Sequence, residues 1–393
     1  MAALRYLLLI LLFMSCTSMG PLQTGSSSSV MFVQSAPVET TLADPSIPSA
    51  REVWPAMIRE AKFQIDIAQM YVASKSGEAI EPVIEELRAA SKRGVRIRML
   101  LSKNMWDSDP NTLKSLQSVP GIEIRPLDLS KLTGGILHAK YWVIDQSDIF
   151  VGSQNFYLRS LTQILELGVK IHDEKLASEL ELIFQSDWKI SQTDQLPAEA
   201  KPALPIGKPE SIELSASPQK LNPSGVKSAL AELLKLIDLA KTTIHIQLLD
   251  YGTSGKGGQW QELESALIRA GERGVQVEMI VSHWNASANA ALNSLKTLAR
   301  AKNLVVKIAT LPLASQGPIP YARVIHSKFM TVDGQTLWLG TSNWSRGYFY
   351  ETRGVELIFR SKELTNTAER LFSRLKDSAY LERVNDQTPV RPR

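Results

Sequence analysis

The sequence predicts an α/β protein built from two similar lobes, each a mixed, largely parallel sheet flanked by helices. Two observations predict this fold class. A strand–loop–helix–strand pattern occurs over 63–102 and again, with matched spacing, over 243–282. A second pattern, in which a histidine and a lysine lie on a short apolar strand, occurs at 138–155 and again at 326–343. Duplication of both patterns predicts two lobes related by a pseudo-twofold axis.

The composition agrees with two globular units. The chain has 393 residues, of which 44% are apolar and 21% charged, as in ordinary folded proteins. This length exceeds what one hydrophobic core usually serves. The net charge of +4 permits an anionic substrate without requiring one.

The N-terminus predicts export. Arg5 is followed by the apolar run 6–14, which has the length of a secretory signal and is too short to span a bilayer. Cys16, the only cysteine, follows this run, so either a lipid is attached to it or it is removed with an ordinary signal peptide. We expect a signal over 1–19 and a flexible spacer over 20–49. The protein would be periplasmic or a membrane-anchored lipoprotein in a bacterium, and secretory or lysosomal in a eukaryote.

The repeated unit has the order strand, helix, strand. Each copy begins with a strand that contains several β-branched residues, over 63–70 and over 243–249. The helix that follows ends at an Arg-Gly pair, because glycine readily adopts the left-handed conformation that terminates a helix. An apolar strand comes next in both copies. This order is that of a βαβ unit, in which the two strands pair in parallel.

A proline-rich segment without periodicity separates the two lobes. The predicted boundaries are 50–190 for the first lobe, 191–225 for the linker, 226–381 for the second lobe and 382–393 for a C-terminal tail.

Two polar motifs recur with identical intervals between their members. The first consists of His138, Lys140, Asp145, Ser153 and Asn155, and the second of His326, Lys328, Asp333, Thr341 and Asn343. In each motif a strand places histidine and lysine two residues apart, so we expect both side chains to face one pocket. A second strand then brings the Ser or Thr and the Asn beside them.

This pair of motifs resembles the signature of the phospholipase D superfamily, and the resemblance covers about 50–359. It implies hydrolysis of phosphodiesters at one shared active site through a phosphohistidine intermediate. The stretches 159–169 and 340–352 are similar to the lysosomal exonuclease branch of the superfamily and its poxvirus relatives. That branch cleaves single-stranded nucleic acid from an end, so the resemblance implies a nuclease.

The residue types fit this chemistry. A phosphodiester needs its negative charge neutralised, a nucleophile at phosphorus and a proton for the leaving group. We expect the two lysines and the two asparagines of the motifs to hold the nonbridging oxygens. One imidazole would attack phosphorus, and the other would protonate the leaving alcohol. The family precedent assigns attack to His138 and protonation to His326.

A catalytic imidazole must be oriented through its other ring nitrogen. Glu166 follows Asn155 by eleven residues, where the family places such a carboxylate, and we expect it to orient His138. The same offset in the second lobe falls on Gly354. An insertion of two residues would bring Glu356 into register instead, and Glu351 is the alternative.

Asp145 and Asp333 each end a strand at a turn, so we expect them to accept hydrogen bonds from turn amides rather than to contact substrate. A zinc site is disfavoured because a lysine ammonium shares the face of each histidine. We therefore expect no metal and no cofactor.

The substrate stays open between single-stranded nucleic acid and a phospholipid. By resemblance Tyr71, Tyr251 and Trp344 would line the substrate path and stack on bases, with Trp106 and Trp284 as further candidates. The alternative is that these aromatic residues belong to the core. No interfacial helix of the kind expected for a lipase follows the signal. No obligatory protein partner is indicated, and a membrane tether would depend on lipid at the N-terminus.

Overall fold

The duplication takes the form of two sheets with corresponding strand orders. A computed structural model describes residues 29–196, 212–255 and 258–391. The first sheet runs, in spatial order, β4 (Ile122–Leu127), β3 (Arg96–Ser102), β2 (Gln64–Gln69), β5 (Tyr141–Ile144), β6 (Asp148–Gly152), β7 (Glu166–His172) and β1 (Ser29–Ser35). The second runs β18 (Leu381–Arg383), β14 (Leu304–Ala309), β13 (Gln276–Ser282), β10 (Thr243–Leu248), β15 (Phe329–Val332), β16 (Thr336–Gly340), β17 (Gly354–Phe359), β8 (Ile212–Ser217) and β9 (Lys227–Ser228). The predicted pair of similar lobes is confirmed.

Both sheets are mixed. Parallel pairing joins β2 to β3 and β3 to β4, and likewise β10 to β13 and β13 to β14. Apart from the short β8–β9 pair, the remaining neighbours in the two sheets are antiparallel. The expectation that parallel pairing dominates is therefore not met. The βαβ repeat supplies only three strands of each sheet, and tight turns join the motif strands, which imposes antiparallel pairing on them.

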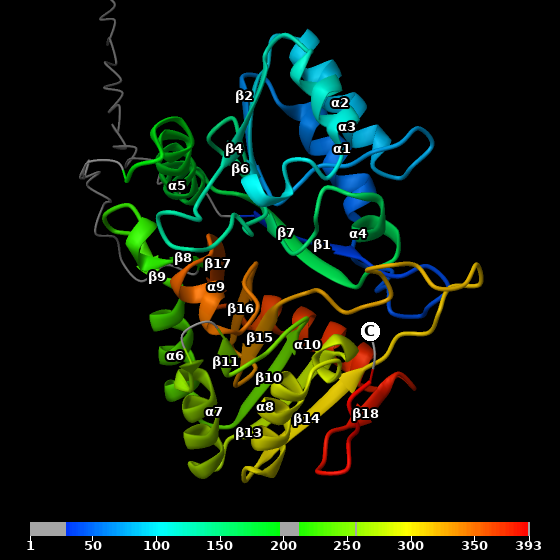
Figure 1. Cartoon of the computed structure of the whole chain (residues 1–393), viewed down its shortest axis with the longest axis vertical. Helices are drawn as coiled ribbons and strands as arrows, with labels where there is room; N and C mark the ends of the chain where they lie inside the picture. The colour runs from blue at the N-terminus through cyan, green and yellow to red at the C-terminus, as the bar shows by residue number, and fades with distance from the viewer. Residues whose placement is uncertain (1–28, 197–211, 256–257, 392–393) are drawn as a thin grey trace, which may run out of the picture.

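Helices cover both faces of each sheet, and Figure 1 shows the two lobes one above the other. The outer helices of the first lobe are α1 (Ala50–Glu60), α2 (Glu81–Lys92) and α3 (Pro110–Gln117), and those of the second are α6 (Ala229–Leu239), α7 (Glu262–Glu272) and α8 (Asn289–Arg300). Two longer helices, α5 (Glu174–Thr193) and α10 (Lys362–Lys376), pack on the inner faces. The short elements are α4 (Leu158–Thr162), α9 (Arg346–Tyr350), η1 (Lys103–Met105), η2 (Gln219–Leu221), η3 (His283–Ala286) and the hairpin of β11 (Ser254–Gly255) and β12 (Gly258–Gln259).

Three large apolar clusters form the core, and a small fourth cluster contains Ile164 of the first lobe with Leu249 and Val324 of the second. One lies under the outer helices of the first lobe and one under those of the second. The third, which we call the shared core, contains side chains of both sheets together with α5 and α10. Because the inner faces of both lobes contribute to it, the two motif regions are held against each other by apolar packing.

The helix ends follow the predicted chemistry. Gly94 and Gly274, just beyond α2 and α7, have φ values of 91° and 97°, which is the left-handed region that glycine enters without steric cost. At the start of α5, the carboxylate of Asp173 accepts from the N–H of Leu176, so it caps an otherwise unpaired donor.

Segments expected to lack structure contribute strands. Strand β1 lies within the expected spacer and pairs with β7, and β8 lies within the expected linker and pairs with β17. Strand β18 begins at the last residue of the expected second lobe and reaches into the expected tail. These strands lie in segments rich in Ser or Pro or at the end of the chain, so their order comes from pairing with a neighbouring strand rather than from a local pattern. The predicted signal and Cys16 lie outside the described residues. Within the described part of the chain, no helix is both long and apolar enough to cross a membrane.

Candidate active site

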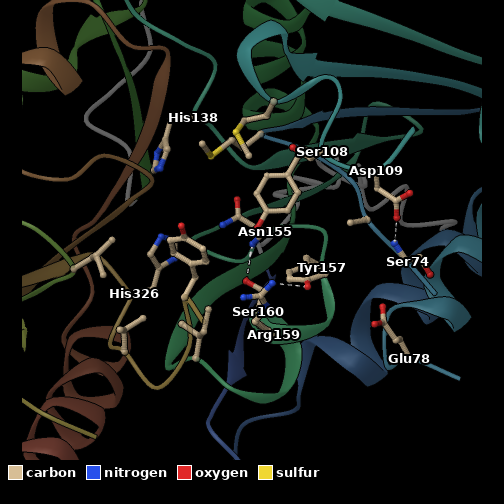
Figure 2. A pocket seen from close by; sticks show the side chains of 18 of the residues that line it. Ser74, Glu78, Ser108, Asp109, His138, Asn155, Tyr157, Arg159, Ser160 and His326 are labelled. Atoms are coloured by element: carbon tan, nitrogen blue, oxygen red, sulfur yellow. Dashed lines mark hydrogen bonds between the residues drawn. The ribbon is translucent and has the colours of Figure 1, made fainter. Parts of the chain in front are cut away.

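The two motif histidines meet where the lobes join. The ring centroids of His138 and His326 are 6.4 Å apart, and both rings line one cavity of about 720 Å³. Both residues are more than nine-tenths buried. Figure 2 shows the two imidazoles on the same side of this cavity. The lobes thus bring together two residues that are 188 positions apart in the sequence.

The main chain of the opposite lobe holds each histidine. The N–H of His138 donates to the carbonyl of Arg353 at 3.0 Å, and the N–H of His326 donates to the carbonyl of Leu165 at 2.8 Å. The ladder of β5 begins only after Lys140, so the expected strand is shorter than predicted. The reason is that the main-chain N–H of each histidine bonds a carbonyl of the other lobe, and only from the lysine onward does the segment bond its own sheet.

The two lysines lie behind the histidines. Lys140 and Lys328 are fully buried, and each ammonium donates to the carbonyl of its own histidine at 2.5 Å. Burial lowers the pKa of Lys140 well below its ordinary value, and it lowers the pKa of Lys328 to about 7. The expectation that the lysine side chains line the pocket beside the histidines is not met, since the cavity lining does not include them.

The two asparagines line the cavity as predicted for Asn155 and Asn343. The buried side-chain oxygen of each has no hydrogen-bond partner within the described residues. An amide can present its oxygen or its N–H₂ group after rotation by half a turn. Both side chains therefore retain polar atoms that the fold does not use and that can bind a ligand.

Different groups orient the two imidazoles. Nδ1 of His326 lies 2.7 Å from the carboxylate of Glu166, and Nδ1 of His138 lies 2.9 Å from the carbonyl oxygen of Thr341. Our expectation that Glu166 orients His138 is therefore wrong. Glu166 is the first residue of β7 and directly follows Leu165, whose carbonyl bonds the N–H of His326 in the second lobe. The hydroxyl of Ser160 donates to the other oxygen of this carboxylate.

The second lobe has no equivalent carboxylate at His138. Gly152 pairs with Gly168 across β6 and β7, and Gly340 pairs with Glu356 across β16 and β17. Glu356 therefore corresponds to Gly168, and the counterpart of Glu166 is Gly354. The predicted insertion of two residues does not occur, so the assignment of Glu356 as the second orienting carboxylate is wrong.

Glu356 instead supports the main chain beside His138. Its carboxyl accepts from the N–H of Thr341 at 3.1 Å, and the carbonyl of Thr341 is the group that bonds His138. Burial raises the pKa of Glu356 to about 8. The alternative, Glu351, forms an ion pair with Arg346 at 2.6 Å beyond the end of α9 and does not line the cavity. Neither glutamate orients a catalytic imidazole directly.

Burial lowers the pKa of both histidines, but to different effect. For His138 the nearby charges of Lys140 and Lys328 add to burial, and the pKa falls well below its ordinary value. For His326 burial lowers the pKa to about 4 against the opposing charge of Glu166. Because a carbonyl can only accept, Nδ1 of His138 is the protonated nitrogen, which leaves a lone pair on Nε2. His138 is thus arranged as a nucleophile and His326 as the group better able to carry a proton.

The motif aspartates hold the fold. The carboxylate of Asp145 accepts from the N–H groups of Lys62, Phe63 and Gln64 at 2.7–2.9 Å. Asp333 makes the corresponding bonds to the N–H groups of residues 241–243. The prediction that both aspartates cap amides is confirmed, with the difference that these amides belong to the segment before β2 or β10.

The motif hydroxyls tie neighbouring strands together. The hydroxyl of Ser153 contacts the main chain of Leu167, and the hydroxyl of Thr341 accepts from the N–H of Val355 at 2.9 Å. Both hydroxyls therefore tie the segment that follows β6 or β16, and that carries the motif Asn, to the neighbouring strand.

Of the aromatic candidates, Tyr71 and Trp284 line the cavity. Tyr251 and Trp344 do not, because both are fully buried in the core of the second lobe, where residues 251 and 344 bridge. Trp106 packs against the outer core of the first lobe. Tyr251 and Trp344 are thus core residues, as the alternative interpretation held, and their assignment to the substrate path is wrong.

Sequence reasoning missed several residues of the cavity. Tyr348 packs edge-on against the ring of His138 with centroids 5.0 Å apart, and Tyr157, Arg159 and Tyr321 line the same space. Ser160 and Tyr348 each lie five residues after a motif asparagine. Aligning the two repeats past the asparagines would have identified this pair.

The sequence is similar to a family of PLD-like domains, to an exonuclease and to a nicking-joining enzyme, and the family matches both lobes that form the site. The family described as "Cardiolipin synthase, PLD-like domain" matches residues 55–188 and again residues 233–376. A protein named 5'-3' exonuclease PLD3 from Rattus norvegicus is 32% identical, with 89% of this chain and 79% of that protein covered. The virion nicking-joining enzyme of vaccinia virus (strain Copenhagen) is 30% identical, with 87% of each chain covered.

Among solved structures, phosphatidylserine synthase from Haemophilus influenzae Rd KW20 superposes with a TM-score of 0.59 over 85% of each chain. Its sequence identity is 13%, so this likeness concerns the fold alone. The chain therefore shares its two-lobed architecture with proteins of very different sequence.

Proposed function

Because the chain belongs to the phospholipase D superfamily, we propose that this phosphodiesterase is a nuclease that hydrolyses single-stranded nucleic acid without a metal ion. The observation that carries the proposal is the pair of unequal histidines, one from each lobe, at one end of a single cavity. One has a carboxylate behind it and the other a carbonyl. This is the arrangement that a two-step phosphoryl transfer requires.

In the first step, Nε2 of His138 attacks phosphorus. A P–N bond forms while the P–O bond to the leaving nucleoside oxygen breaks, and that oxygen takes the proton from Nε2 of His326. The negative charge of Glu166 stabilises the protonated His326 before transfer. The amides of Asn155 and Asn343, with the nearby lysine charges, offset the negative charge that develops on the nonbridging oxygens.

In the second step, a water molecule attacks phosphorus from the side that the leaving group has vacated. His326, now neutral, accepts one proton of this water, and the P–N bond breaks to release a phosphate monoester and free His138. The proton on His326 is then in place for the next cycle. His326 and water supply every proton that is transferred, so no metal hydroxide is needed.

Two features favour nucleic acid as the substrate. The cavity is bordered by the rings of Tyr71, Tyr157, Trp284 and Tyr321, and aromatic faces bind nucleobases by stacking. The relatives that match most of the chain are named as an exonuclease and a nicking-joining enzyme. In the described ranges, no three His, Cys, Asp or Glu side chains form a group that could hold a metal ion.

Purified protein in excess EDTA tests the proposal against single-stranded DNA, single-stranded RNA and phosphatidylcholine. We expect release of nucleotides from nucleic acid, abolished by His138→Ala. Hydrolysis of phosphatidylcholine alone would favour the phospholipase alternative. Loss of activity in EDTA that returns on addition of Mg²⁺ or Zn²⁺ would contradict the metal-independent mechanism.

We also propose that the protein is exported, on the strength of the apolar run 6–14 and the position of Cys16. Mass spectrometry of the mature N-terminus distinguishes lipid on Cys16 from cleavage beyond it. An intact N-terminal Met1 in protein from the native host would contradict export by this route.

A further inference from the structure

One arginine in the active-site cavity has a charge that the fold does not neutralise. Arg159, which follows β6 on the short helix α4, lines the cavity together with both catalytic histidines. Among the ion pairs of the described residues none involves Arg159. The buried arginines Arg98 and Arg353, by contrast, are each paired with an aspartate.

The surroundings of Arg159 hold its guanidinium in place without neutralising it. One N–H group donates to the hydroxyl of Tyr157 at 2.6 Å, and another donates to the carbonyl of Pro320. The guanidinium carbon lies 4.7 Å from the ring centroid of Tyr157 and 6.0 Å from that of Tyr321. These contacts use two of the five N–H donors, so the others remain for an anion. A planar cation held in this way is suited to a phosphate.

Arg159 lies in the same segment as residues that contact the site where the scissile phosphate would bind. It lies four residues beyond Asn155, and the next residue, Ser160, bonds both the N–H of Asn155 and the carboxylate of Glu166. In Figure 2, Asn155 lies between the two histidines and the Arg159–Tyr157 pair. Two carboxylates, Glu78 and Asp109, also line the cavity, and both accept main-chain N–H groups, from Lys75 and from Ser74 and Thr112. Arg159 lies between this acidic part and the histidines (Figure 2).

We propose that Arg159 binds the phosphate adjacent to the scissile one, so that the enzyme recognises a substrate with at least two successive phosphodiesters. This inference rests on the proposed nuclease function and specifies the substrate further. A nucleic-acid strand carries a phosphate at every nucleotide, whereas a phosphatidylcholine molecule has only one. Binding at Arg159 would therefore select a polynucleotide over a single diester.

The test uses thymidine trinucleotides in which one of the two linkages is a methylphosphonate, which has no charge. Such a substrate has a single cleavable diester and keeps all three bases. Two isomers, with the neutral linkage on either side, are compared with the all-phosphate trinucleotide. For the wild type we expect the neutral neighbour to lower kcat/KM by about 10- to 100-fold in one isomer, as loss of a hydrogen bond to a charged group would.

Arg159→Ala should bring the ratio of kcat/KM between the charged and neutral substrates close to one. Arg159→Lys should keep part of the ratio, because the charge remains without the paired donors. On a longer single strand, Arg159→Ala should also reduce the salt dependence of binding by about 0.7 in log–log slope, the contribution of one phosphate contact. Because each ratio is taken within one variant, a general loss of folded protein does not affect it.

Arg346→Ala is the matched control. Arg346 also lies over a tyrosine ring, that of Tyr350 at 5.1 Å, but Glu351 neutralises it and it does not line the cavity. Its removal should leave both the ratio and the salt slope as in the wild type. An unchanged ratio in Arg159→Ala, with nuclease activity present, would overturn the inference alone. Wild-type protein that cleaves phosphatidylcholine but no nucleic acid would remove the proposed function as well.

Discussion

Glu166 and Gly354 occupy matched positions on β7 and β17, and this difference makes the two motif histidines unequal. In the first lobe, Ser160 and Glu166 support His326. In the second lobe, Tyr348 corresponds to Ser160 and packs against the ring of His138. Gly354 corresponds to Glu166 and has no side chain to bond His138, so the carbonyl of Thr341 is the only hydrogen-bond partner of that imidazole among the described residues. A carboxylate stabilises the protonated form of an imidazole, and a carbonyl does so less. The resemblance to the superfamily assigns His138, in the first motif, as the nucleophile. The contact of Glu166 with His326 supports this assignment, rather than the contact of Glu166 with His138 that the sequence suggested.

This inequality has a consequence for pH dependence. His138 must be deprotonated to attack, so activity rises as pH increases through its lowered pKa. His326 must be protonated to act as an acid, so activity falls as pH increases through its pKa of about 4. We expect kcat/KM to be highest on the acid side of neutrality and to fall as the pH increases above the His326 pKa of about 4. A profile that rises through neutrality to alkaline pH would contradict the assignment.

Glu166→Gln tests the contact behind His326. The amide keeps the shape but removes the charge that raises the pKa of His326, so the descending limb should move to lower pH. We expect kcat/KM at the wild-type optimum to fall about 10- to 100-fold, as for other residues that orient a catalytic imidazole. Steady-state kinetics across the pH range measures both effects. If the descending limb of the pH profile did not move, the charge of Glu166 would not affect the pKa of His326, and its role would be packing alone.

Glu356→Gln is the matched control in the second lobe. Burial raises the pKa of Glu356 to about 8, so the side chain is already neutral at the pH of the assay, and glutamine can still accept from the N–H of Thr341. We expect kcat/KM within about threefold of the wild type, since a neutral group of the same shape replaces another. A loss as large as that of Glu166→Gln would show that Glu356 acts as a carboxylate.

At the level of strands and helices, local patterns predicted some elements well and others poorly. The intervals in the two repeats located β2, β3, β5 and β6 and their counterparts, because alternation and buried apolar runs are encoded within each strand. Strands β1 and β8 were missed because a partner strand determines them. The register of β17 was misjudged for the same reason, since only its pairing with β16 shows that Gly354 replaces a glutamate.

An ion pair buried between two elements of different lobes also supports the site. Arg353, which precedes β17, bonds Asp187 of α5 at 2.9 Å, both side chains are fully buried, and the carbonyl of Arg353 accepts the N–H of His138. Asp187→Ala would leave the guanidinium buried without its partner. We expect this to lower the free energy of unfolding by about 3–5 kcal/mol, measured by urea denaturation.

The exposed pair of Arg59 and Glu86 provides the comparison for that measurement. Its side chains are largely or partly in solvent, so Glu86→Ala should cost no more than about 1 kcal/mol. If Asp187→Ala were no more destabilising than Glu86→Ala, the buried pair would not hold α5 to the second lobe.

For the whole molecule, duplication explains why one active site needs both lobes. The sequence repeats supplied the residue types, but not which lobe supports which histidine. That information lies in the contacts between the lobes at Leu165 and Arg353. The carbonyl of each of these residues accepts a hydrogen bond from the motif histidine of the other lobe. No local pattern encodes this crossing, because the contacting segments are far apart in sequence and meet only when the shared core closes.

A trapped intermediate tests whether the two lobes contribute a nucleophile and an acid to one reaction. With a nitrophenyl ester of thymidine phosphate, the leaving group departs without a proton, so His326→Ala should still form the P–N bond but hydrolyse it slowly. We expect a burst of nitrophenol and a peptide that carries thymidine phosphate on His138, identified by mass spectrometry under alkaline conditions. His138→Ala should give neither. A phosphorylated His326 in the His138→Ala protein, with no adduct in His326→Ala, would contradict the account and reverse the two roles.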